Sequence, residues 1–332
     1  MASGYRVLSR GDVRPANDND EFASDLLFGL SQPIKRVPSK YLYDEAGSRL
    51  FCRIMELPEY YPTRCETEIL FRHCSAITEA IAASRINLVE LGAGDGSKTR
   101  ILINHLRTRK IDFRYVPIDI SESAVSQLCS DLSRDCPEIT INGLVSDYFV
   151  GVDWLSHQNA ARNLILFLGS NIGNFDPPYQ THFLTDLWNA LNHGDYVLVG
   201  MDLKKDAAII NQAYNDREEV TAAFNQNLLN RINRELGGNF NPEKFCYYSA
   251  WDPFAGAVRS CLLSRVSQSV HIDALCRSFS FEAWEPLHTE SSYKFSLSDI
   301  RKKASQIGFE VVDNYFDARH FFVDSLWRVV KE

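Results

Sequence analysis

Three alternating glycines follow an apolar run and form the part of this sequence with the clearest chemical use. Residues 87–99 read NLVELGAGDGSKT, with Gly92, Gly94 and Gly96 at the turn. Glycine lets the backbone turn sharply or approach a ligand where a Cβ would clash. A helix that begins after such a turn directs its unpaired N–H groups and its positive end at the same spot. Strand, glycine turn and helix in this order build a nucleotide-type pocket at the carboxyl end of a sheet.

Three kinds of nucleotide pocket compete for this turn, beside a plain glycine turn without a ligand. The glycines follow G-x-G-x-G rather than the full G-x-G-x-x-G fingerprint, which disfavours a dinucleotide and a dehydrogenase. Lys98 and Thr99 stand where a phosphate-binding P-loop has its Lys-Ser/Thr pair, but Ser97 replaces the glycine that this loop requires. Glu90, just before the turn, together with the looser glycine spacing is typical of an S-adenosylmethionine pocket.

Acidic residues at the ends of the next two apolar runs favour an adenosyl ligand. Asp119 ends the run that follows the glycines, where a carboxylate accepts hydrogen bonds from both ribose hydroxyls. Asp147 ends the run after that and is placed to accept from an adenine amino group. Either acid alone reads as a helix cap or turn residue. Two of them at successive strand ends after a glycine turn predict an adenosyl cofactor.

The composition restricts the class of protein. The chain has 332 residues, 45% of them hydrophobic, and a formal net charge of −8. This length suits one large or two modest domains of a soluble globular protein. The acidic balance, without a Lys/Arg run, argues against a nucleic-acid partner, whose phosphates need a basic surface. No apolar stretch reaches the roughly 18–20 residues of a membrane helix, and the N-terminus lacks a signal-peptide pattern.

Cysteines and histidines follow no metal or disulfide pattern. The eight cysteines are scattered without C-x-x-C pairs, which indicates reduced thiols in a cytosolic protein. Neither residue type has the spacing of metal ligands, so we predict no metal. We expect a cytoplasmic monomer that acts on a small molecule and contacts neither nucleic acid nor membrane.

The elements that must position these residues alternate in type. Continuous apolar strands separated by helices predict an α/β fold, with a doubly wound parallel sheet covered on both faces. Helices are expected near 66–84, 123–134 and 179–191, and strands at 87–91, 115–119, 140–144, 163–168 and 195–202. At the C-terminus we expect a helix over 300–306, capped by Ser298 or Asp299 and closed by Gly308. Two antiparallel strands follow it, at 309–316 and 321–330.

Residues 204–293 break the regular alternation of strands and helices, which predicts a second domain inserted into the sheet. It contains helices within 206–236 and short strands at 246–250 and 258–266. The predicted division is a loose N-terminal tail at 1–19, an N-terminal segment at 20–64 that joins the substrate domain, an S-adenosylmethionine-binding core at 65–203, an inserted substrate-binding domain at 204–293, and the C-terminal part of the core at 294–332. We expect the substrate to be held between the two domains.

A tetrapeptide at 176–179, DPPY, resembles the motif of amino methyltransferases that act on adenine or glutamine. In those enzymes the motif follows the fourth strand directly, and its first residue accepts from the target amine. Here residues 169–175 intervene, so we expect DPPY only to start the next helix, with a proline in its first turn. The intervening loop places Asn174 where the fourth strand meets the cofactor.

Several separate segments together resemble the histidine Nα-methyltransferases of ergothioneine biosynthesis. The most specific are PEYYPTR at 58–64 and GSNIGN at 169–174. The others are KYLYD at 40–44, LGAG at 91–94, KTR at 98–100, AYND at 213–216, VTAAFN at 220–225, NREL at 233–236 and TESSYKF at 289–295. The resemblance covers most of the chain from about residue 25. It implies a Rossmann-like S-adenosylmethionine methyltransferase sheet with an inserted α+β substrate-binding domain.

The resemblance also implies roles for the matching residues. S-adenosyl-L-methionine would be held by Tyr43, Gly92, Gly94, Lys98, Asp119, Asp147 and Tyr148. The catalytic residues, which would hold the carboxylate and amine end of the amino acid, are Tyr60, Asn174 and Tyr214. Glu290 and Ser292 would hydrogen-bond the two imidazole nitrogens, and Thr221 and Phe224 would contribute to the same substrate site.

The implied activity is trimethylation of the α-amino group of L-histidine to hercynine, with S-adenosyl-L-methionine as co-substrate. One departure concerns Ser260, which aligns with a methionine that lines the imidazole pocket in the family. A smaller polar residue there widens the pocket or admits water, which keeps another α-amino acid such as tryptophan open as the substrate. The alternatives from other classes are a non-catalytic ligand-binding module on the same fold and a nucleic-acid amino methyltransferase based on DPPY.

Overall fold

The computed structural model describes residues 4–7, 18–83, 85–155 and 161–331. The chain divides into two compact units. The first, called here the sheet unit, comprises Met1–Arg10, Pro62–Lys204 and Lys294–Glu332. The second, called the inserted unit, comprises Gly11–Tyr61 and Lys205–Tyr293. Both units are therefore built from discontinuous stretches of the chain.

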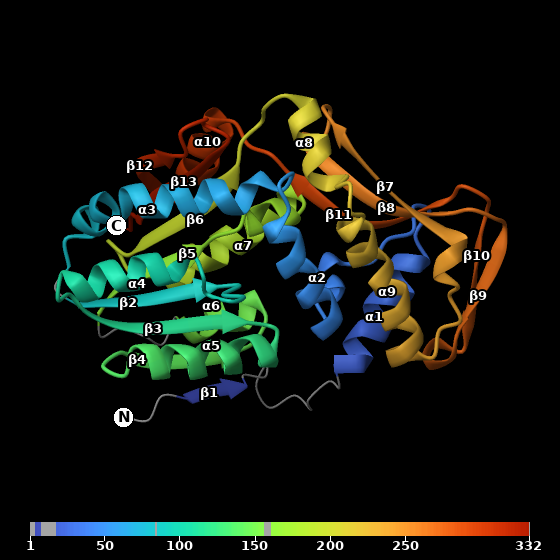
Figure 1. Ribbon diagram of the computed structural model, residues 1–332, viewed down its shortest axis with the longest axis horizontal. Helices are drawn as coiled ribbons and strands as arrows, with labels where there is room; N and C mark the ends of the chain where they lie inside the picture. The colour runs from blue at the N-terminus through green and yellow to red at the C-terminus, as the bar shows by residue number, and fades with distance from the viewer. Residues whose placement is uncertain (1–3, 8–17, 84, 156–160, 332) are drawn as a thin grey trace. The chain divides into compact units, whose positions relative to one another are not determined.

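An eight-stranded sheet with the order β1-β4-β3-β2-β5-β6-β13-β12 forms the centre of the sheet unit (Figure 1). The strands are β1 (Gly4–Val7), β2 (Arg85–Leu91), β3 (Asp112–Asp119), β4 (Thr140–Val145), β5 (Arg162–Phe167), β6 (Tyr196–Asp202), β12 (Phe309–Phe316) and β13 (Phe322–Val329). The strands from β1 to β6 pair in parallel, whereas β13 pairs antiparallel with β6 and with β12. The predicted doubly wound sheet with a C-terminal antiparallel hairpin is confirmed.

The direction of winding reverses between β2 and β5, because the chain runs outward to β3 and β4 and then returns to β5 and β6. In sheets of this kind, ligands bind at such a switch point, beyond the carboxyl ends of the strands. Every residue of β6 is buried, and β2 is buried except for its first residue. Most residues of these strands are apolar because helices cover both faces of the sheet.

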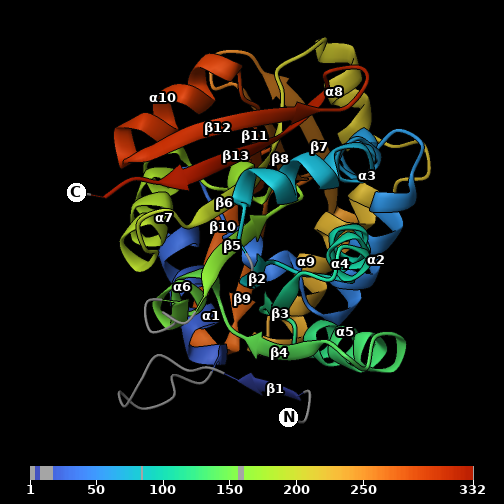
Figure 2. The same cartoon turned by 90° about the vertical axis from the view of Figure 1, so that its left-hand side faces the viewer.

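The helices of the sheet unit are α3 (Tyr61–Ile81), α4 (Thr99–Thr108), α5 (Glu122–Asp135), α6 (Tyr148–Leu155), α7 (Pro177–Ala190) and α10 (Leu297–Ile307), with a short 3-10 helix η2 (Asn171–Asn174). Figure 2 shows α3, α4 and α5 on one face of the sheet and α6, α7 and α10 on the other. In the part of the chain that the structure describes, no helix combines the length and apolarity needed to cross a membrane.

Two terminal features differ from the sequence-based expectation. The tail expected to be loose through residue 19 contains β1, which pairs in parallel with β4, and helix α1 (Asp18–Leu30) begins within it. Residues 8–17 lie outside the described part. Helix α10 is capped by Ser296, not by Ser298 or Asp299: the Ser296 hydroxyl accepts from the Asp299 N–H at 3.2 Å, and the Asp299 carboxylate accepts from the Ser296 N–H at 2.9 Å.

The inserted unit combines helices with two small antiparallel sheets. Its helices are α1, η1 (Ser39–Leu42), α2 (Glu45–Glu56), α8 (Ala207–Tyr214), α9 (Val220–Leu236), η3 (Pro242–Lys244) and η4 (Asp273–Leu275). Its strands are β7 (Phe245–Asp252), β8 (Ala257–Ser264), β9 (Gln268–Ile272), β10 (Arg277–Phe281) and β11 (Pro286–Tyr293). One sheet has the order β11-β8-β7, and the other pairs β10 with β9. The sequence-based prediction of two strands in this region therefore missed β9, β10 and β11.

Candidate functional site

The glycine turn between β2 and α4 is tightly packed at its first glycine and open at its second. Gly92 and Gly94 have φ angles of +75° and +52°. A Cβ at Gly92 would lie 2.7 Å from the Tyr148 Oη and 2.8 Å from the Asn171 Nδ2, so a side chain there would strain the backbone and displace these two groups. A Cβ at Gly94 would meet no atom within 4 Å, and Gly94 is exposed. The turn therefore leaves space for a ligand at Gly94.

Asp119, at the end of β3, is bonded directly to the glycine turn. Its Oδ2 accepts from the Gly94 N–H at 2.9 Å, and its Oδ1 accepts from the Ser121 N–H at 2.9 Å. Burial raises the pKa of Asp119, while the hydrogen bonds from Ser121 and Gly94 favour its charged form. Each carboxylate oxygen has two lone pairs. The carboxylate can therefore accept further hydrogen bonds from a ligand in the turn.

Asp147 and Tyr148 follow the neighbouring strand β4. The Oδ1 of Asp147 accepts from the N–H groups of Phe149 at 2.8 Å and Val150 at 2.9 Å, so this carboxylate caps the start of α6. Both of these bonds go to the same oxygen, Oδ1. The Tyr148 ring contacts Phe167, with ring centroids 5.3 Å apart. Burial, and then the charge of Asp119, raise the pKa of Tyr148, so its hydroxyl stays neutral.

Glu90, which the sequence suggested as an acidic marker of the pocket, points into the core of the sheet unit. It is 2% exposed and accepts hydrogen bonds from the Thr99 hydroxyl at 2.5 Å and from the Tyr115 hydroxyl. Burial raises its pKa to about 7, although both hydrogen bonds favour the charged form. Glu90 therefore fixes the start of α4 to β2 and β3 from beneath the glycine turn.

Lys98 forms an ion pair with Glu66, a residue that the sequence analysis did not single out. Glu66 lies on α3, is fully buried, and accepts from the Gly169 N–H at 2.8 and 2.9 Å through its two oxygens. Burial lowers the pKa of Lys98, but the charge and hydrogen bond of Glu66 outweigh it and raise this pKa. No sequence pattern distinguishes a buried glutamate within a long helix from an exposed one, which explains why Glu66 was missed.

Asn174 ends η2, in the loop that follows β5. Ser170, the residue before η2, has a φ of +57°, and its hydroxyl accepts from the Asp202 N–H at 3.1 Å. The loop is therefore anchored to the end of β6. Helix α7 begins at Pro177, directly after Asp176, which confirms the expectation that DPPY starts this helix.

In the inserted unit, residues expected to bind the cofactor and the substrate share one aromatic cluster. Tyr43 contacts Phe224 and Phe51 edge-on, with ring centroids 5.3 and 5.4 Å apart. Phe51 also contacts Tyr60 at 6.2 Å, and Tyr60 contacts Tyr214 at 6.4 Å. Phe51 at the centre of the cluster was not predicted, because an apolar residue on a helix reads as ordinary core.

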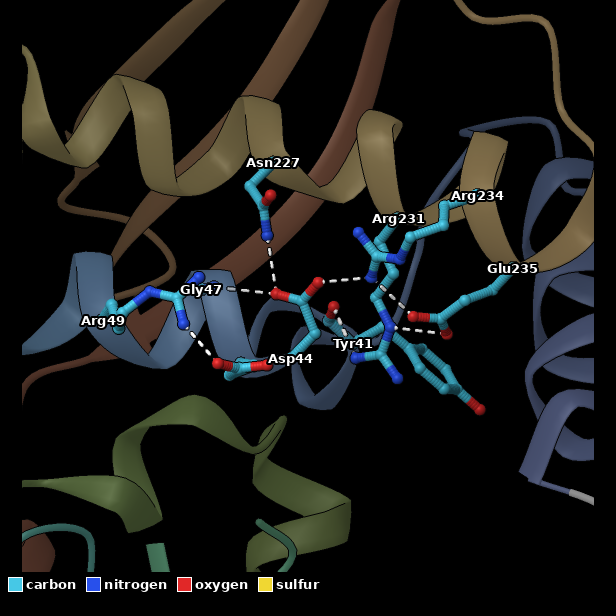
Figure 3. A network of polar contacts seen from close by, with 9 residues as sticks. Tyr41, Asp44, Gly47, Arg49, Asn227, Arg231, Arg234 and Glu235 are labelled. Atoms are coloured by element: carbon cyan, nitrogen blue, oxygen red, sulfur yellow. Dashed lines mark hydrogen bonds and ion pairs between the residues drawn. The ribbon is translucent and has the colours of Figure 1, made fainter. Parts of the chain in front are cut away.

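Tyr43 is positioned by its neighbour Asp44, which caps α2 and links it to α9 (Figure 3). The Oδ1 of Asp44 accepts from the Gly47 N–H and from the Asn227 amide, both at 2.7 Å. Its Oδ2 accepts from the Arg234 guanidinium at 2.6 Å. Burial raises the pKa of Asp44, but the bonds from Gly47, Arg234 and Asn227 outweigh it and lower this pKa overall.

The start of α9 carries Thr221 and Phe224, two further residues expected to contact the substrate. Both are buried, at 6% and 2% exposure. Asp216 caps this helix, because its carboxylate accepts from the N–H groups of Val220 at 2.8 Å and Thr221 at 2.9 Å. Residues three apart in a helix lie on the same face. The cap therefore holds Thr221 in register with Phe224 of the aromatic cluster.

Strands β8 and β11 bring the expected imidazole-binding residues together. The Tyr214 and Ser292 hydroxyls are 2.8 Å apart, and Glu290 lies two residues before Ser292 on β11, hence on the same face of the strand. Ser260 of β8 pairs directly with Glu290 across the sheet. This pairing places Ser260, which departs from the family pattern, beside Glu290, which is predicted to bind the imidazole ring.

Tyr247 on β7 completes this group and was not predicted. Its hydroxyl lies 3.1 Å from the Ser260 Oγ and donates to the Tyr214 carbonyl at 3.2 Å. Burial raises its pKa, as does the nearby charge of Glu290. Ser260 is 2% exposed. The Ser260 hydroxyl thus has the Tyr247 hydroxyl as a hydrogen-bond partner inside the inserted unit.

Comparison with known proteins gives matches over most of the chain. The sequence profile of a family described as histidine-specific methyltransferase, SAM-dependent, matches residues 22–329. The histidine N-alpha-methyltransferase of Mycobacterium tuberculosis is 39% identical over 284 residues, covering 86% of this chain and 87% of that protein. The protein of the same name from Mycolicibacterium smegmatis is 36% identical over 284 residues, with the same coverage. The 4-dimethylallyltryptophan N-methyltransferase easF of Claviceps purpurea is 24% identical over 311 residues, covering 88% of this chain and 90% of that protein.

Proposed function

Because this chain belongs to the family of histidine-specific, S-adenosylmethionine-dependent methyltransferases, we propose that it trimethylates the α-amino group of L-histidine to hercynine. The protein is an S-adenosylmethionine-dependent N-methyltransferase. The observation that carries the substrate assignment is the contact between Tyr214, expected at the amino-acid end, and Ser292, expected at the imidazole end. Residues for both ends of one histidine thus lie within one group of side chains.

The methyl donor fits the end of the sheet unit at the switch point. The open glycine turn at Gly94 suits a nucleoside, and Asp119 is the carboxylate for its ribose hydroxyls. The Oδ2 of Asp147, which takes no part in the bonds from Phe149 and Val150, is proposed to accept from the adenine amino group. Lys98 is the cation beside the turn and is assigned to the carboxylate of the donor. When bound, the donor supplies an electrophilic sulfonium methyl group.

The residues proposed to hold the substrate carboxylate are uncharged, which suits a site next to the cationic sulfonium of the donor. Tyr60 and Tyr214 offer neutral hydroxyls to the substrate carboxylate, whereas an arginine would place a permanent cation beside the cationic sulfonium. The α-ammonium must lose a proton before each transfer, so that its lone pair faces the methyl group in line. Asn174 is assigned to the same end of the substrate. It belongs to the sheet unit, whereas Tyr60 and Tyr214 belong to the inserted unit.

Glu290 and Ser292 are proposed to recognise the imidazole ring. A carboxylate accepts from one ring N–H, and a hydroxyl can satisfy the other nitrogen. Loss of a hydrogen bond to a charged group costs about 1.5–3 kcal/mol, or about 10–150-fold in affinity. Such a difference is large enough to select histidine over other aromatic amino acids.

The proposal is tested with the purified protein, S-adenosylmethionine and a panel of amino acids, with products identified by mass spectrometry. We expect mono-, di- and trimethylated histidine, and a large loss of histidine turnover in Glu290→Ala. Glu243→Ala, an exposed carboxylate of the same unit, is the control and should behave as the wild type. Histidine that stays unmethylated while the donor binds would refute the substrate assignment.

Another α-amino acid such as tryptophan is the second candidate substrate. Two observations favour it: Ser260 replaces the methionine of the family pattern, and easF, named for a tryptophan derivative, matches along the chain. If tryptophan is the substrate, Ser292→Ala should leave turnover intact, because an indole has one ring N–H for Glu290 and no second ring nitrogen for the Ser292 hydroxyl. A histidine enzyme should be severely impaired by the same change.

A further inference from the structure

A pair of buried acidic side chains lies behind Lys98 in the sheet unit. Glu66 on α3 and Asp324 on β13 are both fully buried. Asp324 pairs across the sheet with Gly200 of β6, and a Cβ at Gly200 would lie 2.0 Å from the Glu66 Oε1. Glycine at position 200 therefore makes room for the Glu66 carboxyl group against the sheet, beside Asp324.

The two carboxyl groups differ in their hydrogen-bond partners. Glu66 contacts the Lys98 ammonium and accepts from the Gly169 N–H through both oxygens. Both oxygens of Asp324 are buried, and among the described residues they have no donor. An ionised carboxylate without a donor is strongly disfavoured in a protein interior. Asp324 is therefore not stable here as an ionised carboxylate by itself.

A proton on Asp324 removes this buried charge. The neutral carboxyl group can then donate a hydrogen bond to the Glu66 carboxylate. Burial, and then the negative charge of Glu66, raise the pKa of Asp324 well above its ordinary value, and Lys98 opposes them. Glu90 is the further acidic group near Lys98. With Asp324 protonated, Glu66 and Lys98 balance in charge. With Asp324 ionised, the group would carry a net negative charge and repel the donor's carboxylate.

We propose that Glu66 and a protonated Asp324 are positioning residues for the methyl donor, with Glu66 orienting Lys98 and the Asp324 proton holding Glu66 in place. This inference rests on the proposed assignment of Lys98 to the carboxylate of the donor. The Lys98 ammonium has three N–H donors, so a bond to Glu66 leaves others for that carboxylate. Glu66 also fixes the Gly169 N–H, at the start of the loop that carries Asn174. One buried side chain thus sets the position of both neighbouring segments.

The kinetic test compares isosteric variants of the whole 332-residue chain. In Asp324→Asn the amide replaces the proton as donor to Glu66, so the KM for S-adenosylmethionine should stay within about twofold of wild type. In Glu66→Gln the charge that orients Lys98 is lost, and this KM should rise about tenfold or more, while the KM for the amino acid changes little. Asp195→Asn, a buried carboxylate bonded to Asn163 instead, is the control for general destabilisation.

The proton itself is tested by infrared spectroscopy. The wild-type minus Asp324→Asn difference spectrum should contain the carbonyl band of a protonated carboxyl group at neutral pH, and the wild-type minus Asp195→Asn spectrum should lack it. Absence of this band in the first spectrum would overturn the shared proton. This measurement uses only wild type and isosteric variants, so it decides the question even where Glu66→Gln does not fold.

Calorimetric binding of S-adenosylhomocysteine separates this inference from the proposed function. Weak binding by Glu66→Gln and by Lys98→Met, with normal binding by Asp324→Asn, supports the positioning role whichever amino acid is methylated. Tight binding by wild type without histidine turnover would remove only the substrate assignment. Unchanged binding in Glu66→Gln would remove only the positioning role, and unchanged binding in Lys98→Met would remove the assignment on which it rests.

Discussion

Glu90 and Tyr247 show how single polar groups in the interior support the site without lying at its surface. Glu90 accepts from Thr99 and Tyr115 beneath the glycine turn, and Tyr247 joins Ser260 to the Tyr214 backbone. Neither belongs to a motif that reveals its contacts. The glycines and Asp119 were predictable because a nucleotide turn demands these residue types at fixed places. The supporting groups were not, because their partners lie on other helices and strands that only the fold brings next to them.

Glu90 should make the stability of the protein depend on pH near neutrality. Its pKa is raised from an ordinary 4.5 to about 7 in the folded protein, so folding takes up a proton between these values. The stabilisation is complete below the lower value and is lost as pH rises through the higher one. Between pH 5 and 8, the wild type should lose about 2.5 kcal/mol more unfolding free energy than Glu90→Gln. Urea denaturation at the two pH values measures this, and parallel losses would contradict it.

Tyr247→Phe tests the environment of the proposed imidazole pocket. Removal of the hydroxyl leaves the Ser260 Oγ without this partner at a site where it is 2% exposed. A neutral hydrogen bond contributes about 0.5–1.5 kcal/mol, so the KM for histidine should rise about 2–10-fold with an unchanged KM for the donor. Tyr248→Phe, the adjacent residue with a 52% exposed side chain, is the control. Equal effects of the two changes would speak against the assignment.

At the level of elements, prediction succeeded where a run of apolar residues marks the strand and failed where polar residues break up the run. The apolar runs at β2 to β6 and the hairpin of β12 and β13 gave clear signals. Strands β9 and β10 have sequences QSVHI and RSFSF, in which serines interrupt the pattern and most side chains of β10 are exposed. The cap of α10 was misplaced for a related reason: Ser296, Ser298 and Asp299 all suit a cap, and only the backbone shows which one precedes the first turn.

The cap of α2 should contribute measurably to stability. Asp44 accepts from Gly47, Asn227 and Arg234, so Asp44→Ala removes the cap and the link between α2 and α9 (Figure 3). We expect a loss of about 2 kcal/mol in unfolding free energy. Glu45→Ala, which removes only the exposed pair with Arg49, should change it by less than about 0.5 kcal/mol. Thermal denaturation of both variants measures the difference, and equal losses would contradict the assigned role of the Asp44 network.

For the whole molecule, the division into two units gives a prediction about where each ligand acts. The residues proposed for the donor lie in the sheet unit except Tyr43, and those proposed for the amino acid lie in the inserted unit except Asn174. In hydrogen exchange, S-adenosylhomocysteine alone should therefore slow exchange at the glycine turn and at the ends of β3 and β4. Exchange in β7 and β8 should stay unchanged. Protection spread evenly over both units would contradict the predicted domain roles.

The position of β13 has a consequence for how the chain matures on the ribosome. β6 receives its second neighbour only from β13, after the entire inserted unit has been synthesised. Until then, the growing polypeptide presents an apolar edge with unsatisfied N–H and C=O groups, which is a template for aggregation. Nascent chains that are arrested before residue 322 should for this reason depend on chaperones to stay soluble. Chains that include β13 should not depend on them.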